Sequence, residues 1–523
     1  MPAAALRTYV EELLAVRGLP GLSLAVTDRE GIVASETFGS ADVAAGKPVA
    51  QKTRFQHGSI GKTFTAIALL QLREEGLVDL DEPVTRYLPW FEVRSEHGPI
   101  TIHHLLSHTG GIVMGDALSA NSRFDVWALR ETDTGFPPGA RFHYSNVGFR
   151  ALGHVVEEVS GSPYAQVVRK RILEPLGMRD TDPAVSSTTR ASLAVGHERW
   201  FDDRPSRRSD PWVPAPWLET GTGDGSLAGS AEDLALFLRA LLNRGRGLVR
   251  PETFDLMATP RVEVEGDWVY GYGLELREVG GKLEIGHGGS MPGFGSVMRG
   301  DLDAGLGVVV LVNGMDEDDL SEEVGTAALG LYRDGTGPPS VQDPLVVPNA
   351  ADFEGRYVGD AGRLDLVAAD QRLLLGGYEG IALEPRGEDR FLVDHPRFAL
   401  FLLRFRRRDG SVVRVTHGED VYVREGTVAD HVPRSRDEWR ALPGHYRAYN
   451  PWLSNFRVIL RGDELVLDWP WWRLEDELTS LSDGSFRVGA EEWSPERLRF
   501  DAIVEGRALR ASLSGCGDYY RLP

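Results

Sequence analysis

The sequence predicts an α+β protein in which an antiparallel sheet flanked by helices, with a helical insertion, precedes two small all-β units. Strand patterns near both ends of residues 1–335 enclose a helix-rich middle, so one sheet is expected to form from both ends of that segment. The Pro-rich stretch "DGTGPPSVQDPLVVPNA" (334–350) then reads as a linker. Beyond it the helical periodicity disappears, and short alternating segments occur in two similar sets.

The elements of the first part follow from periodicity and from Pro/Gly breaks. Residues 1–20 predict an amphipathic helix, and "GLSLAVTD" and "GIVASETFG" predict a β-hairpin after it. Strand patterns return at "YGYGLEL", "GKLEIGHG" and "GLGVVVLVN". The expected helices lie at 59–75, 145–159, 163–173, 230–243 and near 318–332.

The last part predicts two copies of one unit. Phe353-x-Gly355-x-Tyr357 opens the first copy, and Leu442-Pro443-Gly444-x-Tyr446 opens the second. In each copy a Leu-rich alternating strand and a Phe-x-Val strand follow. Antiparallel barrels are expected, because closure of a sheet removes its exposed edges. The expected domains are 1–335, a linker at 336–350, and barrels at 351–432 and 433–523.

Length, charge and cysteine content limit the function classes. A chain of 523 residues exceeds what one core usually organises. A net charge of −21 argues against nucleic acid or an anionic membrane as a partner. The sequence contains no apolar run of about 18 residues and no visible export signal, and its single cysteine, Cys516, excludes an internal disulfide. A cytoplasmic location is therefore expected, and a homodimer stays open.

The stretch "FQHGSIGKTFTAIALLQLREEG" (55–76) permits two chemistries. Gly61-Lys62-Thr63 resembles the end of a phosphate-binding loop, but that loop needs a glycine where Gln56 stands. Ser59 and Lys62 are three residues apart at the start of a helical pattern, so their side chains share one face. That spacing suits a serine nucleophile and its base. In a purely structural alternative, Ser59 caps the helix and Lys62 is a solvated residue of its first turn.

Two further stretches favour the nucleophile. Tyr144 and Asn146 precede a long amphipathic helix, and His287-Gly288-Gly289 ends a strand pattern. With this order of motifs, and with "TIHHLLSHTGGI", "ILEPLGM" and "GSLAGSAEDLALF", residues 3–333 resemble the serine β-lactamase-like hydrolases. The resemblance is to the branch of class C β-lactamases, D-aminopeptidases and esterases. It implies a β-lactamase/transpeptidase-like domain, and the two lipocalin-like barrels resemble the layout of D-aminopeptidases.

The resemblance also implies roles for individual residues. Ser59 would form an acyl-enzyme, Lys62 would act as base once burial lowers its pKa, and Tyr144 would relay the proton. Asn146 would hold Lys62 and the substrate amide, and His287 would orient or protonate the leaving group. The N–H groups of Ser59 and Ser290 would form an oxyanion hole, and Gly288 and Gly289 would let the substrate backbone approach. The branch more often has threonine at position 288, which weakens a penicillin-type substrate.

The predicted function is hydrolysis of a small peptide or amide substrate, in the manner of a D-stereospecific peptidase. The alternatives are an esterase or acyltransferase, a β-lactamase or DD-carboxypeptidase, and a non-catalytic binding protein. No cofactor is expected. His103, His104 and His108 are candidate zinc ligands, because two histidines four residues apart on a helix can bind one ion. No Glu follows the first His as it does in zinc proteases, which argues against a zinc site.

Overall fold

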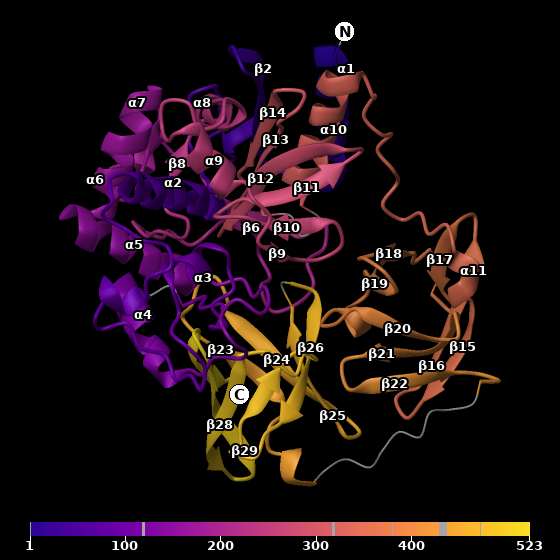
Figure 1. Ribbon diagram of the computed structural model, residues 1–523. Coiled ribbons are helices and arrows are strands. Elements are labelled where there is room, and N and C mark those ends of the chain that lie inside the picture. The colour runs from indigo at the N-terminus through magenta and orange to yellow at the C-terminus, as the bar shows by residue number, and fades with distance from the viewer. Residues whose placement is uncertain (1, 118–120, 316–318, 379, 428–436, 471) are drawn as a thin grey trace. The chain divides into compact units, whose positions relative to one another are not determined.

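The computed structural model describes residues 2–117, 121–315, 319–378, 380–427, 437–470 and 472–523. It contains two compact units (Figure 1). Unit 1 comprises Met1–Glu198, Val213–Ser340 and Ser514–Cys516, and unit 2 comprises Arg199–Trp212, Val341–Leu513 and Gly517–Pro523. The expected boundaries at 335 and 350 stay predictions, and the one at 432 lies outside the described residues.

Unit 1 is built on a nine-stranded sheet in the order β3-β2-β1-β14-β13-β12-β11-β10-β9. The N-terminal strand β1 pairs antiparallel with the late strand β14, with Leu24 opposite Val310. The prediction of one sheet formed from both ends of this segment is therefore confirmed. The strands are β1 (Gly21–Asp28), β2 (Ile32–Asp42), β3 (Lys47–Pro48), β9 (Val262–Glu263), β10 (Trp268–Tyr270), β11 (Glu275–Val279), β12 (Lys282–Met291), β13 (Phe294–Asp301) and β14 (Leu306–Val312).

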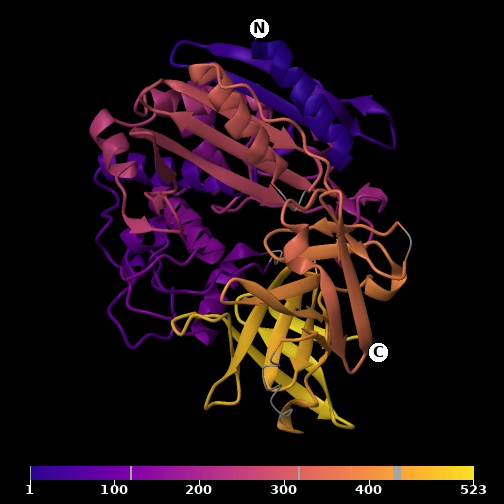
Figure 2. The same cartoon turned by 90° about the vertical axis from the view of Figure 1, so that its right-hand side faces the viewer.

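Helices cover both faces of this sheet, because alternate residues of a strand point to opposite sides. Gly307 of β14 faces Leu238 of α8 (Ala231–Leu242), whereas Val308 and Val310 face Gly325 of α10 (Leu320–Asp334). Helix α1 (Pro2–Arg17) lies beside α10 (Figure 2) and is bound to it by the hydrogen bond from the Tyr9 hydroxyl to Glu323, at 2.8 Å.

A helical layer packs against α8 and the sheet. Phe64 of α2 (Gly61–Glu74) is fully buried and stacks on Phe237 of α8 with ring centroids 3.8 Å apart. Helix α5 (Asn146–Ser160) packs against α2. The other α-helices described in unit 1 are α3 (Ile102–Leu106), α4 (Ser122–Trp127), α6 (Tyr164–Val168), α7 (Glu174–Leu176) and α9 (Pro251–Met257), whereas α11 (Ala350–Phe353) belongs to unit 2. Short strands β4 (Phe55–Gln56), β8 (Ala228–Gly229) and β5 (Thr181–Asp182) form a small sheet, and β6 (His197–Arg199) pairs with β7 (Trp212–Pro214).

Two local features differ from the sequence expectation. The single helix expected at 163–173 is α6, then a π-helical turn at Arg169–Leu173, then α7. Strand β13 was not predicted, because its sequence "FGSVMRGD" contains two glycines and lacks clean alternation. It is nevertheless a central strand, since β12 and β14 pair with it on either side.

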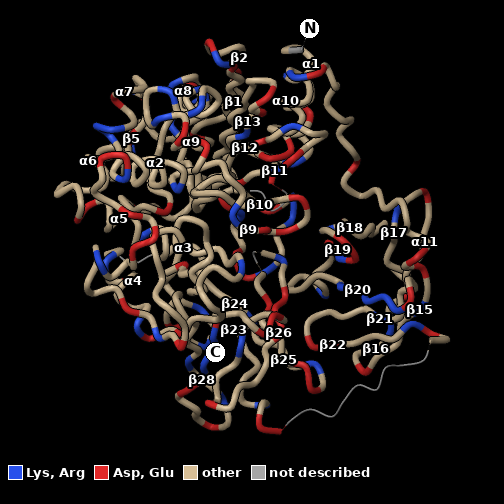
Figure 3. The backbone as a smooth tube through the Cα atoms, in the orientation of Figure 1, with Lys and Arg blue, Asp and Glu red and all other residues tan. Residues whose placement is uncertain are grey.

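Unit 2 contains two eight-stranded antiparallel sheets, which confirms the two expected barrels. Strands β23–β30 form a closed barrel. The other sheet has the order β17-β16-β15-β22-β21-β20-β19-β18, and its ends meet where Leu375 N donates to Ile381 O at 2.9 Å. Acidic and basic residues are interspersed along β15–β22 (Figure 3).

The bounds of these strands are β15 (Gly355–Gly359), β16 (Gly362–Ala369), β17 (Arg372–Leu375), β18 (Leu383–Pro385), β19 (Arg390–Val393), β20 (Leu403–Arg408), β21 (Ser411–His417), β22 (Asp420–Arg424), β23 (Gly444–Arg447), β24 (Asn455–Arg461), β25 (Glu464–Trp469), β26 (Leu474–Ser480), β27 (Phe486–Val488), β28 (Arg497–Val504), β29 (Arg507–Leu513) and β30 (Gly517–Arg521).

The two barrels share a local device at the position where the sequence repeat begins. The buried hydroxyl of Tyr357 donates to Phe353 O at 2.8 Å, and that of Tyr446 donates to Leu442 O at 2.7 Å. Each tyrosine thus ties its first strand to the residue four positions earlier, where the chain enters the barrel. A buried phenol needs such a partner, which explains why both copies keep a tyrosine there.

None of the helices in the described part of the chain combines the length and apolar character needed to cross a bilayer.

Candidate active site

Ser59 lies in a 3₁₀ turn, Gly58–Ile60, that leads directly into α2. The preceding Gly58 has φ +52°, and a Cβ atom there would meet Ser290 N of β12 at 2.5 Å. Glycine is therefore required both for the backbone conformation and for the close approach of β12. The packing brings the C-terminal end of β12 against the turn that carries Ser59. The sequence expectation began the helix at Ser59, whereas α2 begins at Gly61.

Lys62 connects three polar groups from distant parts of the chain. Its Nζ lies 3.0 Å from Ser59 Oγ, 2.7 Å from Asn146 Oδ1 and 2.8 Å from the backbone oxygen of Asp224. The side chain is fully buried, and the amine faces these acceptors instead of solvent. A solvated Lys62 is thereby excluded, and so is a lysine that projects from an open phosphate-binding loop.

Burial lowers the pKa of Lys62 to about 7 from an ordinary value of 10.5. Removal of the ammonium from water is the largest cause. The positive charge of Arg150 lowers the pKa further, whereas the negative charges of Asp224, Asp116 and Glu275 oppose the shift. Near neutral pH a large fraction of Lys62 is thus an uncharged amine, which can accept a proton.

Tyr144 completes the group around Ser59. Its ring centroid lies 4.8 Å from Lys62 Nζ. Burial raises the pKa of the Tyr144 phenol well above its usual value, although the Ser59 side chain is close enough to lower that pKa in part. The hydroxyl is therefore a neutral donor near pH 7. The ring packs against that of His108, with centroids 4.3 Å apart.

Asn146 is positioned by the first turn of α5. The preceding Ser145 caps the helix by accepting from Gly148 N at 3.1 Å, and its hydroxyl donates to Val113 O at 2.8 Å. The backbone N–H of Ser145 also donates to His108 Nδ1 at 3.0 Å. These contacts fix the start of the helix, so the side chain of Asn146 reaches Lys62.

His287 of β12 is buried behind Tyr144, with ring centroids 6.4 Å apart. Its Nδ1 lies 2.6 Å from Gly288 O, which can only accept, so Nδ1 carries the proton in the neutral ring. Nε2 then accepts from the Tyr270 hydroxyl at 2.9 Å. Burial lowers the pKa of His287, with the negative charge of Glu275 opposing. The structure thus gives His287 a partner, Tyr270, that the sequence did not suggest.

The glycines of β12 differ in what surrounds them. A Cβ at Gly289 would meet His57 O at 2.1 Å and Ser59 N at 3.0 Å, so this glycine allows β12 to contact the turn. A Cβ at Gly288 would have no atom within 4 Å. Ser290 follows on the exposed edge, with its backbone beside Gly58.

Comparison with known proteins agrees with this arrangement. The profile of the beta-lactamase family matches residues 6–331, which is more than half of the chain. The chain belongs to the beta-lactamase family. The resemblance inferred from the sequence motifs is therefore confirmed, as is the β-lactamase/transpeptidase-like fold.

The proteins similar to this chain include an esterase, a penicillin-binding protein homologue and an amidohydrolase. Esterase EstB of Burkholderia gladioli is 36% identical over 200 residues, a match that covers 34% of this chain and only half of EstB. The octameric penicillin-binding protein homologue from Pyrococcus abyssi has a TM-score of 0.60 at 27% identity, with 81% of this chain and all of that chain covered.

A third similar structure is the D-stereospecific amidohydrolase from Streptomyces sp.. It has a TM-score of 0.52 at 28% identity, with 64% of this chain and 99% of that chain covered. Together these similarities identify a serine hydrolase family and leave the substrate undecided.

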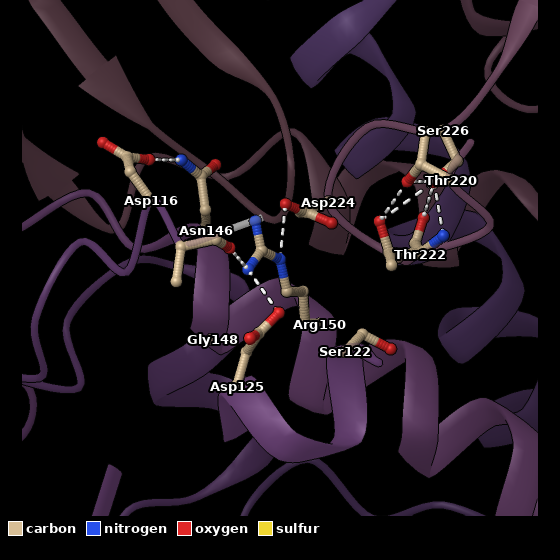
Figure 4. Close-up of polar contacts among 12 residues, drawn as sticks. Asp116, Ser122, Asp125, Asn146, Gly148, Arg150, Thr220, Thr222, Asp224 and Ser226 are labelled. Atoms are coloured by element: carbon tan, nitrogen blue, oxygen red, sulfur yellow. Dashed lines mark hydrogen bonds and ion pairs between the residues drawn. The ribbon is translucent and has the colours of Figure 1, made fainter. Parts of the chain in front are cut away.

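Sequence reasoning missed a network of charged residues beside the beta-lactamase-type site (Figure 4). Asn146 Nδ2 donates to Asp116 Oδ1 at 2.6 Å. Arg150, also on α5, forms ion pairs with Asp125 at 3.0 Å and with Asp224 at 2.9 Å. The only sequence signal was local, since Asp116 and Asp224 each follow a glycine in a loop segment. Nothing in that pattern indicates which distant residues they contact.

The loop that carries Asp224 is closed by hydroxyl groups. Ser226 Oγ lies 2.9 Å from Thr220 Oγ1 and 2.9 Å from Thr222 Oγ1 (Figure 4). These bonds shape the loop itself. Thr65 Oγ1 of α2 donates to Gly223 O at 2.5 Å, which holds the loop beside α2 where the backbone oxygen of Asp224 accepts from Lys62.

The histidines considered as metal ligands have protein partners instead. His103 Nδ1 lies 2.6 Å from the Tyr272 hydroxyl, and His104 Nδ1 accepts from Thr101 N at 3.1 Å. Within the described ranges, no group of three or more His, Cys, Asp or Glu is arranged to hold a metal ion.

Proposed function

We propose that this chain is a serine hydrolase that forms an acyl-enzyme on Ser59 and cleaves an amide or peptide bond of a small substrate, in the manner of a D-stereospecific peptidase. The observation that carries this proposal is the contact at 3.0 Å between Ser59 Oγ and the buried amine of Lys62. An amine with a pKa near 7 is a suitable base for a serine hydroxyl, because it is partly uncharged at the working pH.

Acylation is proposed to proceed in three proton transfers. Lys62 Nζ takes the proton from Ser59 Oγ as this oxygen attacks the substrate carbonyl carbon. Tyr144, a neutral phenol near Ser59, donates its proton to the leaving nitrogen and recovers one from the Lys62 ammonium. The C–N bond breaks, the free amine departs and the acyl group stays on Ser59 as an ester. Water then repeats the sequence and releases the acid.

The tetrahedral oxyanion is proposed to bind the N–H groups of Ser59 and Ser290. Support comes from the close packing of β12 on the turn at Gly58, which brings these two backbone segments together. Each such donor contributes roughly 3 kcal/mol to lowering the barrier. His287 is proposed to act near the leaving group, either directly or through its hydrogen bond with Tyr270.

The substrate class rests on two supports. The D-stereospecific amidohydrolase from Streptomyces sp. is 28% identical to this chain. Gly288 offers no side chain to contact a substrate carboxylate, and the space beside it is open. We therefore place D-aminoacyl amides ahead of penicillin-type substrates. An esterase activity is the second candidate, favoured by the 36% identity to EstB over 200 residues.

Covalent labelling tests the proposed nucleophile. A fluorophosphonate probe is expected to modify the wild-type protein on Ser59, and Ser59→Ala is expected to abolish labelling. Ser290→Ala is the matched control, since only its backbone is assigned a role. An unlabelled wild type, or a Ser59→Ala variant that still reacts, would refute the proposal.

A substrate panel then decides the bond that is cleaved. The panel contains the D- and L-alanine p-nitroanilides, p-nitrophenyl acetate and a chromogenic cephalosporin. Faster turnover of the D-anilide than of its L-enantiomer is expected. Turnover of the acetate ester alone would replace the peptidase assignment with the esterase one.

A further inference from the structure

A buried chain of hydrogen bonds leads from the proposed base to a carboxylate that has no part in the reaction steps above. Lys62 Nζ contacts Asn146 Oδ1 at 2.7 Å. Asn146 Nδ2 in turn donates to Asp116 Oδ1 at 2.6 Å, the bond drawn in Figure 4. Asp116 is 7% exposed and follows Gly115, whose φ is +73°. A Cβ at Gly115 would meet Val147 at 2.5 Å, so the loop carrying Asp116 lies directly against the start of α5.

The carboxylate decides which way the amide of Asn146 points. An ionised carboxylate can only accept hydrogen bonds, so it selects the NH₂ end of the amide and leaves the oxygen to face Lys62. A neutral partner with both donors and acceptors would allow either orientation. With the amide reversed, its NH₂ group would face the amine and compete for its lone pair.

The acceptors around Lys62 determine where the lone pair of its uncharged amine points. An uncharged amine has two N–H groups and one lone pair. Asn146 Oδ1 and the backbone oxygen of Asp224 can only accept, so they take the two N–H groups. The lone pair is then left for the third neighbour, the hydroxyl of Ser59, which is the direction that proton transfer requires.

The other acidic residues near Lys62 have a different partner. Asp224 and Asp125 form ion pairs with Arg150 and do not contact the Asn146 amide. The charges that act on Lys62 from the surrounding elements are those of Asp224, Arg150, Asp116 and Glu275. The neighbouring titratable groups His108, His287 and Tyr144 are neutral near pH 7, because burial lowers the pKa values of both histidines and raises that of the tyrosine.

We propose that Asp116 is a positioning residue for the base: by accepting the NH₂ group of Asn146, it keeps the Asn146 oxygen on Lys62 and reserves the lone pair of that amine for Ser59. The inference rests on the proposed function, because it assigns Lys62 the role of base. It goes beyond that function by giving Asp116 two effects on the base: it orients the Asn146 amide, and its negative charge favours the Lys62 ammonium.

The variant Asp116→Asn tests the proposal, because it preserves size and removes both the charge and the strict acceptor. The readout is the second-order rate of fluorophosphonate labelling, measured from pH 5 to pH 9 and normalised to the folded fraction. The plateau rate is expected to fall by up to about 100-fold, the scale of a small misplacement in an active site. The pH midpoint of the rise is expected to fall by about half a unit or more, because a negative charge that favoured the ammonium is lost.

A double-mutant cycle separates positioning from a general structural role. In the Asn146→Ala background, adding Asp116→Asn is expected to change the plateau rate less than twofold, since the amide to be oriented is already absent. Two independent, multiplying losses would overturn the proposal. An unchanged pH midpoint in Asp116→Asn would also overturn it, because a merely structural defect lowers the amount of active protein without moving the midpoint.

Two controls keep the outcomes distinct. Asp133→Asn removes an exposed carboxylate paired with Arg94 and is expected to leave rate and midpoint unchanged. If Asp116→Asn does not fold, Asp116→Glu provides the test. It keeps the charge, so the wild-type midpoint is expected, and a lowered midpoint would overturn the proposal. An unlabelled wild-type protein would refute the proposed function and this inference together, whereas a labelled wild type with a normal Asp116→Asn profile refutes the inference alone.

Discussion

The protonation of Lys62 makes the most demanding prediction of this structure. Burial lowers its pKa to about 7, whereas an exposed lysine titrates near 10.5. At pH 7 about half of the Lys62 side chains are therefore uncharged, against about 1 in 3,000 for an exposed lysine. The buried site thus increases the fraction of competent base by about 10³-fold at neutral pH.

Pre-steady-state labelling of Ser59 as a function of pH measures this effect. In the proposed mechanism only the uncharged amine accepts the serine proton, so the rate is expected to rise as pH increases through about 7 and then to level off. In Lys62→Arg the guanidinium cannot lose its proton, and the rate at pH 8 is expected to fall by about 10³-fold or more. Lys170→Arg, at an exposed site in the same unit, is the matched control and is expected to behave as wild type.

Two results would refute this reasoning. One is a labelling rate that stays flat between pH 5.5 and 8.5, since a base with a pKa near 7 must titrate in that window. The other is a folded Lys62→Arg variant that retains the wild-type rate, since its guanidinium carries no lone pair for the serine proton.

Four substitutions extend the test to the rest of unit 1. Gly289→Ala is expected to abolish labelling of Ser59, because its Cβ would lie 2.1 Å from His57 O. Gly288→Ala places its Cβ in open space and is expected to change the free energy of unfolding by less than about 0.5 kcal/mol. Equal behaviour of the two variants would contradict the packing of β12. Phe64→Ala is expected to lower the free energy of unfolding in urea by about 3–5 kcal/mol, because a fully buried ring stacked on Phe237 is lost. A change below about 1 kcal/mol would contradict that burial. Arg150→Met is expected to lower the free energy of unfolding in urea by about 3–5 kcal/mol, because the buried carboxylates of Asp125 and Asp224 lose their ion pairs with Arg150. A neutral effect would show that these carboxylates reach solvent.

The sequence was sufficient for those parts of the protein that depend on short-range order. Ser59 and Lys62 are three residues apart, and that spacing alone brings the two side chains to 3.0 Å once a helix begins there. The two barrels were likewise visible as a repeated pattern, because alternation and the Gly-x-Tyr strand openings are local features. Strand β13 and the π-helical turn at Arg169–Leu173 were not visible, since tertiary packing overrides weak local preferences there.

What only the tertiary structure decided is the environment of the amine at Lys62. Residues 116, 146, 150 and 224 come from a loop, a helix and a second loop, and no local pattern encodes their distances from one another. The electrostatic consequence depends on those distances and on the exclusion of water, both of which are properties of the folded packing. The sequence thus determined which groups are available for the chemistry, and the fold determined their protonation, because a pKa depends on burial and on neighbouring charge.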